Sequence, residues 1–163
     1  MQFCGGKNQK RIHAMNRPLV LYPLILLHFL LGISALYGGW ILMSAPHIFG
    51  VRLEWLEGSP FGSFFLPGFI LLVFNGLFPL FIAFGLLLKP TWPFANVLNI
   101  YCDRHWAWTY SLFSGIILII WITVQLMMVP SFWLQPVFLA TGLWILIFTL
   151  WPGVMKHFQI SEK

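Results

Sequence analysis

The chain has 163 residues, of which 60% are hydrophobic and 8% are charged, and its formal net charge is +5. A soluble domain carries about 25% charged residues, so this composition excludes an ordinary soluble protein and predicts one embedded in a lipid bilayer. The basic residues are too dispersed to form a nucleic-acid surface. We expect them to contact anionic lipid headgroups instead.

Four apolar runs, each free of Asp, Glu, Lys and Arg, divide the chain. They cover about 18–44, 64–88, 106–129 and 132–151. A helix needs about 20 residues to cross the hydrocarbon core of a bilayer, and each run reaches that length. We therefore expect an all-α fold in which four antiparallel transmembrane helices form one domain over residues 18–152.

The segment before the first run, residues 1–17, is expected to be a cytoplasmic tail, with translation starting at Met15 instead of Met1 as an open alternative. Within the first run, Ser34 and Gly38 lie one helical turn apart, and so do Ala35 and Gly39. This spacing of small residues lets membrane helices approach each other closely, so we expect a helix contact there.

Residues 45–63 form the longest connection outside the predicted membrane core, and we expect a short amphipathic helix or turn there, lying on the outer surface. The second run contains Pro67 and Pro79. We expect a kink near Pro79, because neighbouring groups must satisfy the carbonyl that a proline leaves free. The loop 90–105 then leads into the third run.

The third and fourth runs are joined by the short turn Val129-Pro130-Ser131, so their helices must be neighbours. Ser131 is the expected N-cap of the fourth helix. Gln125 and Gln135 flank the turn, and we expect a hydrogen bond between them, with a polar entrance to an outer pocket as the alternative. Residues 153–163 are expected to be a second cytoplasmic tail.

The distribution of charge predicts how the helices are oriented. Eight of the nine basic residues lie in the two tails and in the connection between the second and third runs: Lys7, Lys10, Arg11, Arg17, Lys89, Arg104, Lys156 and Lys163. By the positive-inside rule, both termini then lie in the cytoplasm, and we expect a multi-pass protein of the bacterial inner membrane. Cys4 and Cys102 would lie on the same reducing side, where a structural disulfide is not expected.

Few polar residues interrupt the apolar runs, and polar residues inside a membrane are the default place to look for function. At 1.5 Å per residue, His28 and Asn75 both lie ~15 Å deep, and Ser114 lies ~12 Å from the inner face, within reach of them. One hypothesis is a polar cluster that binds a ligand headgroup or relays a proton. The alternative is a set of interhelical hydrogen bonds that only stabilise packing.

Glu54 and Glu57 lie three residues apart in the outer segment, close in sequence to His47. Such groups can hold a divalent cation or perform acid–base chemistry, and the alternative is the solvated face of an interfacial helix. No CxxC, HExxH, P-loop or GxSxG motif is present. We therefore expect no catalytic residue, no metal site and no bound cofactor.

A resemblance to known proteins is carried by four short motifs. They are Leu53-Glu54-Trp55-Leu56-Glu57-Gly58-Ser59-Pro60-Phe61, Leu66-Pro67-Gly68, His105-Trp106-Ala107-Trp108 and Trp133-Leu134-Gln135-Pro136. In these motifs the chain resembles a group of small bacterial four-helix membrane proteins over about residues 15–158. The resemblance implies a four-span fold and supplies no substrate or catalytic residue.

Three hypotheses of function follow. The first is a non-enzymatic accessory or interaction subunit, in contact with lipids and with a protein partner or further copies of itself. The second is a small transporter or binder of an apolar solute, lipid or hydrophobic cofactor, using His28, Asn75 and the outer segment. The third is a membrane enzyme that acts through Glu54, Glu57 and His47.

Overall fold

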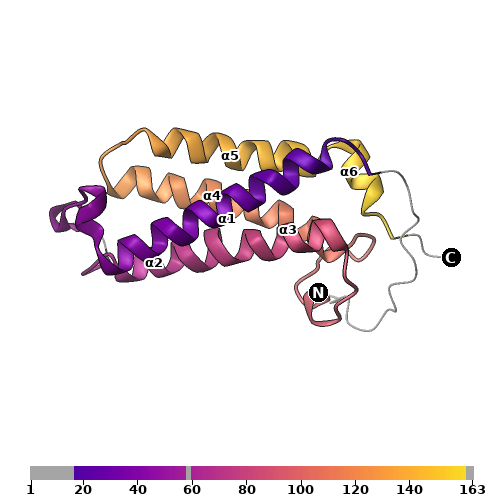
Figure 1. Ribbon diagram of the computed structural model, residues 1–163, viewed down its shortest axis with the longest axis horizontal. Helices are drawn as coiled ribbons and strands as arrows, with labels where there is room; N and C mark the ends of the chain where they lie inside the picture. The colour runs from indigo at the N-terminus through magenta and orange to yellow at the C-terminus, as the bar shows by residue number, and fades with distance from the viewer. Residues whose placement is uncertain (1–16, 58–59, 161–163) are drawn as a thin grey trace.

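A computed structural model describes residues 17–57 and 60–160, and these residues fold mainly into helices. Four long rods run side by side along the long axis of the molecule (Figure 1). The rods are α1 (Leu21–Ser44), a composite of α2 (Phe65–Ile70), the π-helix η3 (Leu71–Leu77) and α3 (Phe78–Leu88), then α4 (Trp106–Met128) and α5 (Leu134–Thr149). The all-α expectation is confirmed.

Three of the rods are long and apolar enough to cross a membrane. The fourth, α5, has 16 residues, which is about 24 Å of helix and less than the ~30 Å of an average hydrocarbon core. The fourth helix is therefore shorter than the predicted run 132–151.

The shorter elements lie at the two ends of the rods. At one end, called the distal end, the 3₁₀ helices η1 (Pro46–Phe49) and η2 (Leu53–Leu56) follow α1, and residues 129–133 join α4 to α5. At the other end, η4 (Phe94–Asn96) lies between α3 and α4, and α6 (Pro152–His157) follows α5. We call this the basic end, because Arg17, Lys89, Arg104 and Lys156 lie there.

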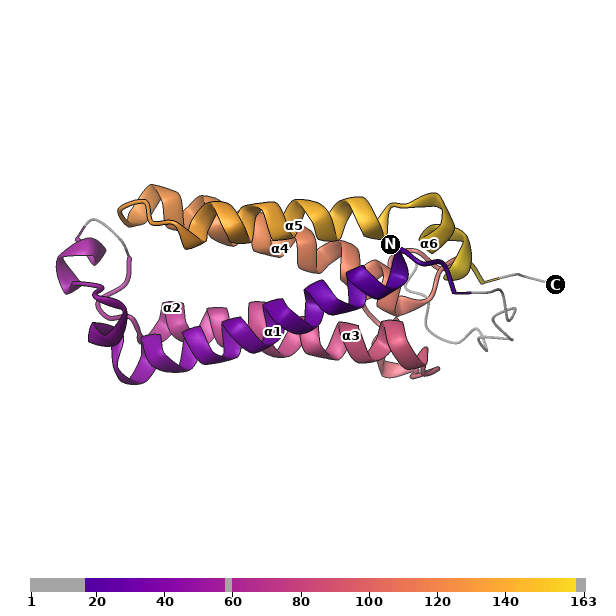
Figure 2. The ribbon, with the colours of Figure 1, turned by 45° about the horizontal axis from the view of Figure 1, so that its top comes forward.

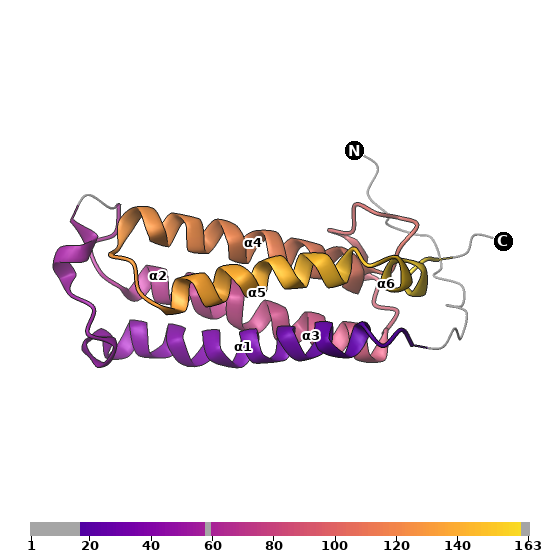
Figure 3. The same cartoon turned by 90° about the horizontal axis from the view of Figure 1, so that it is seen from above.

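The rods form two layers, one made of α1 with the α2–η3–α3 rod and the other of α4 with α5 (Figures 2 and 3). Glycines set the contact inside the first layer. A Cβ atom built on Gly39 would lie 2.7 Å from the carbonyl oxygen of Gly68, and one on Gly76 would lie 3.2 Å from the backbone nitrogen of Leu36. Only a residue without a side chain allows two helix backbones to come this close.

Glycines also allow the close backbone contact in the second layer. A Cβ atom on Gly115 would lie 3.2 Å from the carbonyl oxygen of Gly142, and one on Gly142 would lie 3.3 Å from the carbonyl oxygen of Gly115. Ser34 and Gly38, by contrast, are partly exposed, and a Cβ on Gly38 would meet only a Leu71 methyl group at 3.6 Å. The close approach on α1 therefore occurs at Gly39, in the second of the two expected pairs, and not at Ser34 and Gly38.

The expected distortion near Pro79 takes the form of a widened turn. Proline has no N–H to donate and its ring presses on the carbonyl four residues earlier, which here belongs to Asn75. Residues 71–77 form a π-helix, in which each carbonyl accepts from five residues ahead, as shown by the Phe78 N–H bonded to Val73 O. The wider turn keeps the rod continuous across the proline.

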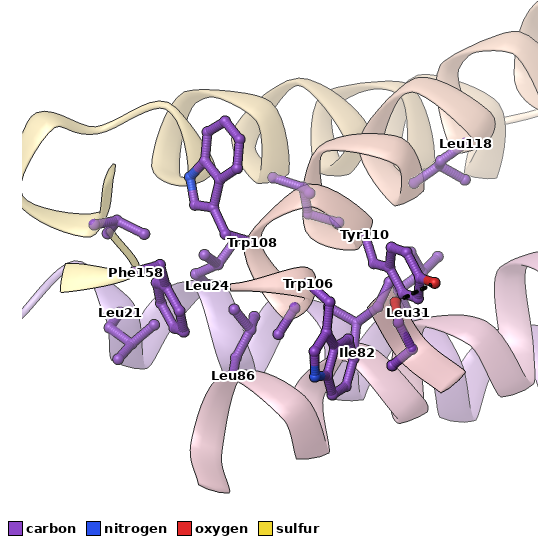
Figure 4. Packing of buried hydrophobic residues seen from close by; sticks show 14 of the residues in the cluster. Leu21, Leu24, Leu31, Ile82, Leu86, Trp106, Trp108, Tyr110, Leu118 and Phe158 are labelled. Carbon is purple, nitrogen blue, oxygen red and sulfur yellow. Dashed lines mark hydrogen bonds between the residues drawn. The ribbon is translucent and has the colours of Figure 1, made fainter. Parts of the chain in front are cut away.

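The hydrophobic core is concentrated towards the basic end (Figure 4). Trp106 and Phe158 are its largest fully buried side chains. Phe81 stacks on Trp106 with ring centroids 5.0 Å apart, and Trp92 stacks on Trp106 at 6.0 Å. Residues from 153 onward were expected to be a tail, yet Val154 and Phe158 belong to this core, so the described part of that segment is packed against the rods.

The glycine contacts predict opposite effects for two adjacent substitutions. Gly39→Ala should destabilise the protein by about 1–3 kcal/mol, because its methyl group overlaps backbone atoms that cannot move aside. Gly38→Ala, on the same helix, should be neutral or stabilising by about 0.5–1 kcal/mol, because alanine is the better helix former. Thermal unfolding in mild detergent measures both, and equal midpoints for the two variants would contradict the packing described here.

Candidate functional site

The three interior candidates, His28 on α1, Asn75 on η3 and Ser114 on α4, are all buried, with 0–1% of their surface exposed. Their environments differ from the expected hydrogen-bonded packing. Both polar atoms of the Asn75 amide, the Ser114 hydroxyl and Nε2 of His28 have no hydrogen-bond partner among the described residues. No interhelical bond joins any two of them in this part of the chain.

The tautomer of His28 follows from its one hydrogen bond. Its Nδ1 lies 2.9 Å from the carbonyl oxygen of Leu24 on the same helix. Since a carbonyl can only accept, Nδ1 carries the proton and donates it. Nε2 is therefore an unprotonated acceptor with a lone pair that faces the protein interior without a donor.

The glycine contacts give the spacing of these groups along the bundle. Gly76 packs against both Gly32 and Leu36, so it lies level with the turn between them. His28 precedes Gly32 by one turn, and Asn75 lies next to Gly76, which separates His28 and Asn75 by roughly 7–10 Å along the axis. The polar groups thus form a row along the axis, which we call the interior polar row, and not a single cluster.

Ser114 belongs to this row by its position on α4. A Cβ on Gly85 of α3 would lie 3.0 Å from the Cβ of Ala107, so the Ala107 face of α4 meets α3. Ser114 follows Ala107 by seven residues and shares that face. The side chain therefore lies between α4 and the η3–α3 rod that carries Asn75.

One member of the row was missed in the sequence. Nε1 of Trp121 is buried and has no partner among the described residues, and Trp121 lies seven residues beyond Ser114 on the same face of α4. Tryptophans of membrane helices usually lie at the interface. A tryptophan seven residues from the end of the third run was a signal that could have been used.

The acidic residues of the outer segment are arranged differently. Glu54 lies on η2, Glu57 follows it and His47 lies on η1, and all three are exposed. Among the described residues, no group of three or more His, Cys, Asp or Glu side chains is close enough to hold a metal ion. The structure therefore gives these residues the surroundings of a solvated surface.

The two glutamines of the turn are not bonded to each other. Oε1 of Gln135 accepts from the backbone N–H of Phe132 at 3.0 Å, and its Nε2 has no partner. This bond ties the Gln135 amide to the residue that precedes the N-cap of α5. That N-cap is Trp133, with no side-chain cap, and not the expected Ser131. The predicted Gln125–Gln135 link is wrong for this reason.

The basic end is closed by cations that donate to carbonyl oxygens at helix C-termini. The bonds are Arg17 Nη2 to Leu87 O at 3.3 Å, Lys89 Nζ to His157 O at 3.0 Å and Arg104 Nη1 to Met155 O at 2.9 Å. The last carbonyls of a helix have no partner within the helix and carry partial negative charge. Each cation thus satisfies a carbonyl that would otherwise be free.

Aromatic side chains and a short backbone pairing complete this closure. The indole N–H of Trp108 donates to Thr149 O at 2.8 Å, at the C-terminus of α5. The His105 N–H donates to Phe158 O at 2.9 Å, and the Ile160 N–H donates to Asp103 O at 2.8 Å. The start of α4 and the segment after α6 are therefore held together.

Two buried histidines of the basic end are held neutral. Burial lowers the pKa of His105 to about 4, and its Nδ1 accepts the Ala107 N–H at the start of α4 at 3.2 Å. Burial also lowers the pKa of His157 to about 4, helped by the positive charges of Lys89 and Arg17. Burial and Arg17 lower the pKa of Lys89 to about 8.

The cysteines depart from the sequence expectation in one respect. Cys102 has no free thiol in the structure, contrary to the expectation that it is unpaired. Cys4 lies outside the described residues.

No protein-family model, no curated protein and no solved structure matches the chain. The resemblance to small bacterial four-helix membrane proteins stays a prediction.

The lowered histidine pKa values predict how stability depends on pH. In the unfolded chain His105 and His157 take up protons near pH 6.5, whereas in the folded protein they do so only near pH 4. The free energy of unfolding is therefore greatest above pH 6.5 and falls as the pH drops towards 4. Each histidine contributes a slope of up to about 1.4 kcal/mol per pH unit. His157→Leu should reduce the acid-induced fall of the unfolding midpoint, and His47→Leu, at an exposed distal position, should leave it unchanged. An identical fall in wild type and His157→Leu would contradict the buried neutral state of His157.

Proposed function

We propose that the chain is a non-enzymatic integral membrane protein of the bacterial inner membrane, a four-span antiparallel bundle with both termini in the cytoplasm. Its work is binding, and its interior polar row holds the polar group of a small, largely apolar molecule. The charge distribution and the three long apolar helices support the membrane placement. Trp133 and Trp151, exposed on either side of the shorter α5, suit the two interfaces of a bilayer that thins locally around it.

The observation that carries the binding proposal is the set of buried polar atoms without partners. More than about 90% of buried polar groups in proteins are hydrogen-bonded, and each unpaired one costs about 1–3 kcal/mol. Here the Asn75 amide, the Ser114 hydroxyl and His28 Nε2 all lack a described partner. A bound molecule with a polar group would satisfy them, and its apolar part would suit the surrounding side chains.

The widened turn at Asn75 supports the same proposal. Single turns of π-helix recur at functional sites because they shift side chains out of the regular helical pattern. In this chain the π-helix η3 spans Leu71–Leu77 and contains Asn75. Pro79 accounts for the widened turn itself, whereas the buried amide placed within it is costly for packing alone, so a role in recognition accounts for the amide.

The accessory-subunit hypothesis loses one of its supports. The small-residue faces that could have met a partner helix are used for contacts within the chain, at Gly39, Gly76, Gly115 and Gly142. What remains is the exposed apolar surface of the rods, which a lipid environment explains equally well. The enzyme hypothesis depends on Glu54, Glu57 and His47, and all three side chains are exposed to solvent and not enclosed in a site.

Replacement of the interior amide tests the binding proposal. Wild-type protein purified in mild detergent should retain a molecule that organic extraction and mass spectrometry distinguish from the bulk lipid, and Asn75→Leu should lose it. Thr123→Val is the matched control, because the exposed Thr123 hydroxyl bonds only its own helix at Ile119 O. This control should retain the molecule at the wild-type level.

Stability distinguishes an occupied site from a merely unsatisfied one. If the amide has no partner in the cell, Asn75→Leu removes a cost of about 1–3 kcal/mol and should raise the unfolding midpoint. If the amide holds a ligand, the same variant should lower it. The proposal would be refuted if Asn75→Leu raised the unfolding midpoint and the wild-type protein retained no copurified molecule.

A further inference from the structure

The segment between α3 and α4 is held firmly to the bundle from its inner side. Ala95 and Asn99 are buried at 2% exposure. Tyr110 Oη donates to Ala95 O at 2.7 Å, and Thr109 Oγ1 donates to Asn99 Oδ1 at 2.5 Å. Both donors belong to α4, so this segment is fixed against a rigid helix.

The outer side of the same segment is apolar and uncovered. Its exposed side chains are Phe94 at 63%, Val97 at 54%, Leu98 at 63% and Ile100 at 56%, and we call them the loop patch. The thirteen residues from Pro90 to Cys102 contain no charged side chain. Four large apolar side chains exposed together outside the rods are unusual for a surface that faces water.

The loop patch is continuous with the exposed apolar surface of α3. Trp92 stacks on Phe84 with ring centroids 5.6 Å apart and on Phe94 at 5.4 Å. Phe84 and Leu88 are themselves exposed on α3. This row of stacked rings extends the side of the rod without interruption into the loop.

The direction of the segment is also informative. Figure 1 shows the chain between α3 and α4 projecting sideways from the basic end, across the long axis of the rods. If the rods cross a bilayer, a segment in this position lies parallel to the membrane plane. It lies at the level where the helices leave the hydrocarbon.

We infer that the loop patch is a rigid foot that inserts into the interface of the cytoplasmic leaflet, with Phe94, Val97, Leu98 and Ile100 among the upper acyl chains. This inference rests on the membrane placement proposed above. Lipid is favoured over a protein partner because the patch continues a surface that already faces acyl chains and carries no charge to specify a partner. Because the backbone is already fixed by Tyr110 and Thr109, insertion orders no flexible chain.

The function of such a foot is to fix the depth and rotation of the bundle in the membrane. Interfacial aromatic and apolar anchors set these quantities for membrane helices. A bundle whose fourth rod is shorter than the others depends more on such an anchor than one with four matched helices.

The test places an environment-sensitive fluorescent amino acid at Leu98 and reconstitutes the full chain into vesicles of phosphatidylcholine and phosphatidylglycerol. Emission should shift to the blue, and lipids brominated near the headgroup should quench it. The same probe at Thr91, an exposed residue of this segment outside the patch, should give weaker quenching. Unshifted, unquenched emission at Leu98 would overturn the inference, whether the patch then faces water or a protein.

A third probe position separates this inference from the membrane placement itself. Ile120 is exposed near the middle of α4, so a probe there should be quenched by lipids brominated deep in the acyl chain. Quenching at Ile120 with none at Leu98 would reject the foot and leave the spanning bundle intact. Absence of quenching at both positions would reject the membrane placement together with the foot.

Discussion

A backbone polar group in hydrocarbon has no water to bond and must find its hydrogen-bond partner within the chain. Helices meet that constraint along their whole length, and the rods of this protein are helices with apolar side chains on their outer faces. The single difficulty inside the rods is Pro79, which cannot donate to the carbonyl of Asn75. The π-helix Leu71–Leu77 resolves it by moving the hydrogen bonds to partners five residues away.

The same constraint explains why the two ends of the molecule differ. Helix C-termini present free carbonyls, and at the basic end these accept from Arg17, Lys89 and Arg104 and from the indole N–H of Trp108. The cations are thus structural parts of the closure. The interior polar row runs from His28 towards the distal end, so a molecule bound along it would be closed off from the basic end.

Within the rods, apolar packing alone does not define the contacts, because lipid tails are as apolar as the side chains. Close backbone approach at glycine supplies the specificity. Gly39 with Gly68 and Gly115 with Gly142 each hold one layer together, and Gly85 receives the ring of Trp106 between the layers. Large aromatic side chains then fill the basic end, where Trp106 and Phe158 are fully buried.

The sequence was sufficient to predict the helical class, the existence of the apolar helices and the burial of His28, Asn75 and Ser114, because long uncharged runs leave few alternatives. It could not show that these three lack partners, since hydrogen bonding depends on the register between helices, which the glycine contacts set. It also missed the packing of Val154 and Phe158, because a short amphipathic segment after Pro152 has the composition of a tail. The bond of Gln135 to its own helix start was missed because local capping competes with the expected cross-turn partner.

Reporter fusions in a bacterial host determine on which side of the membrane the basic end lies. Reporters joined after Lys89 and after Ile160 should both be active only in the cytoplasm, and reporters joined after Gly50 and after Pro130 should be active only on the opposite side. A result that places Lys89 and Ile160 on different sides of the membrane would contradict the account.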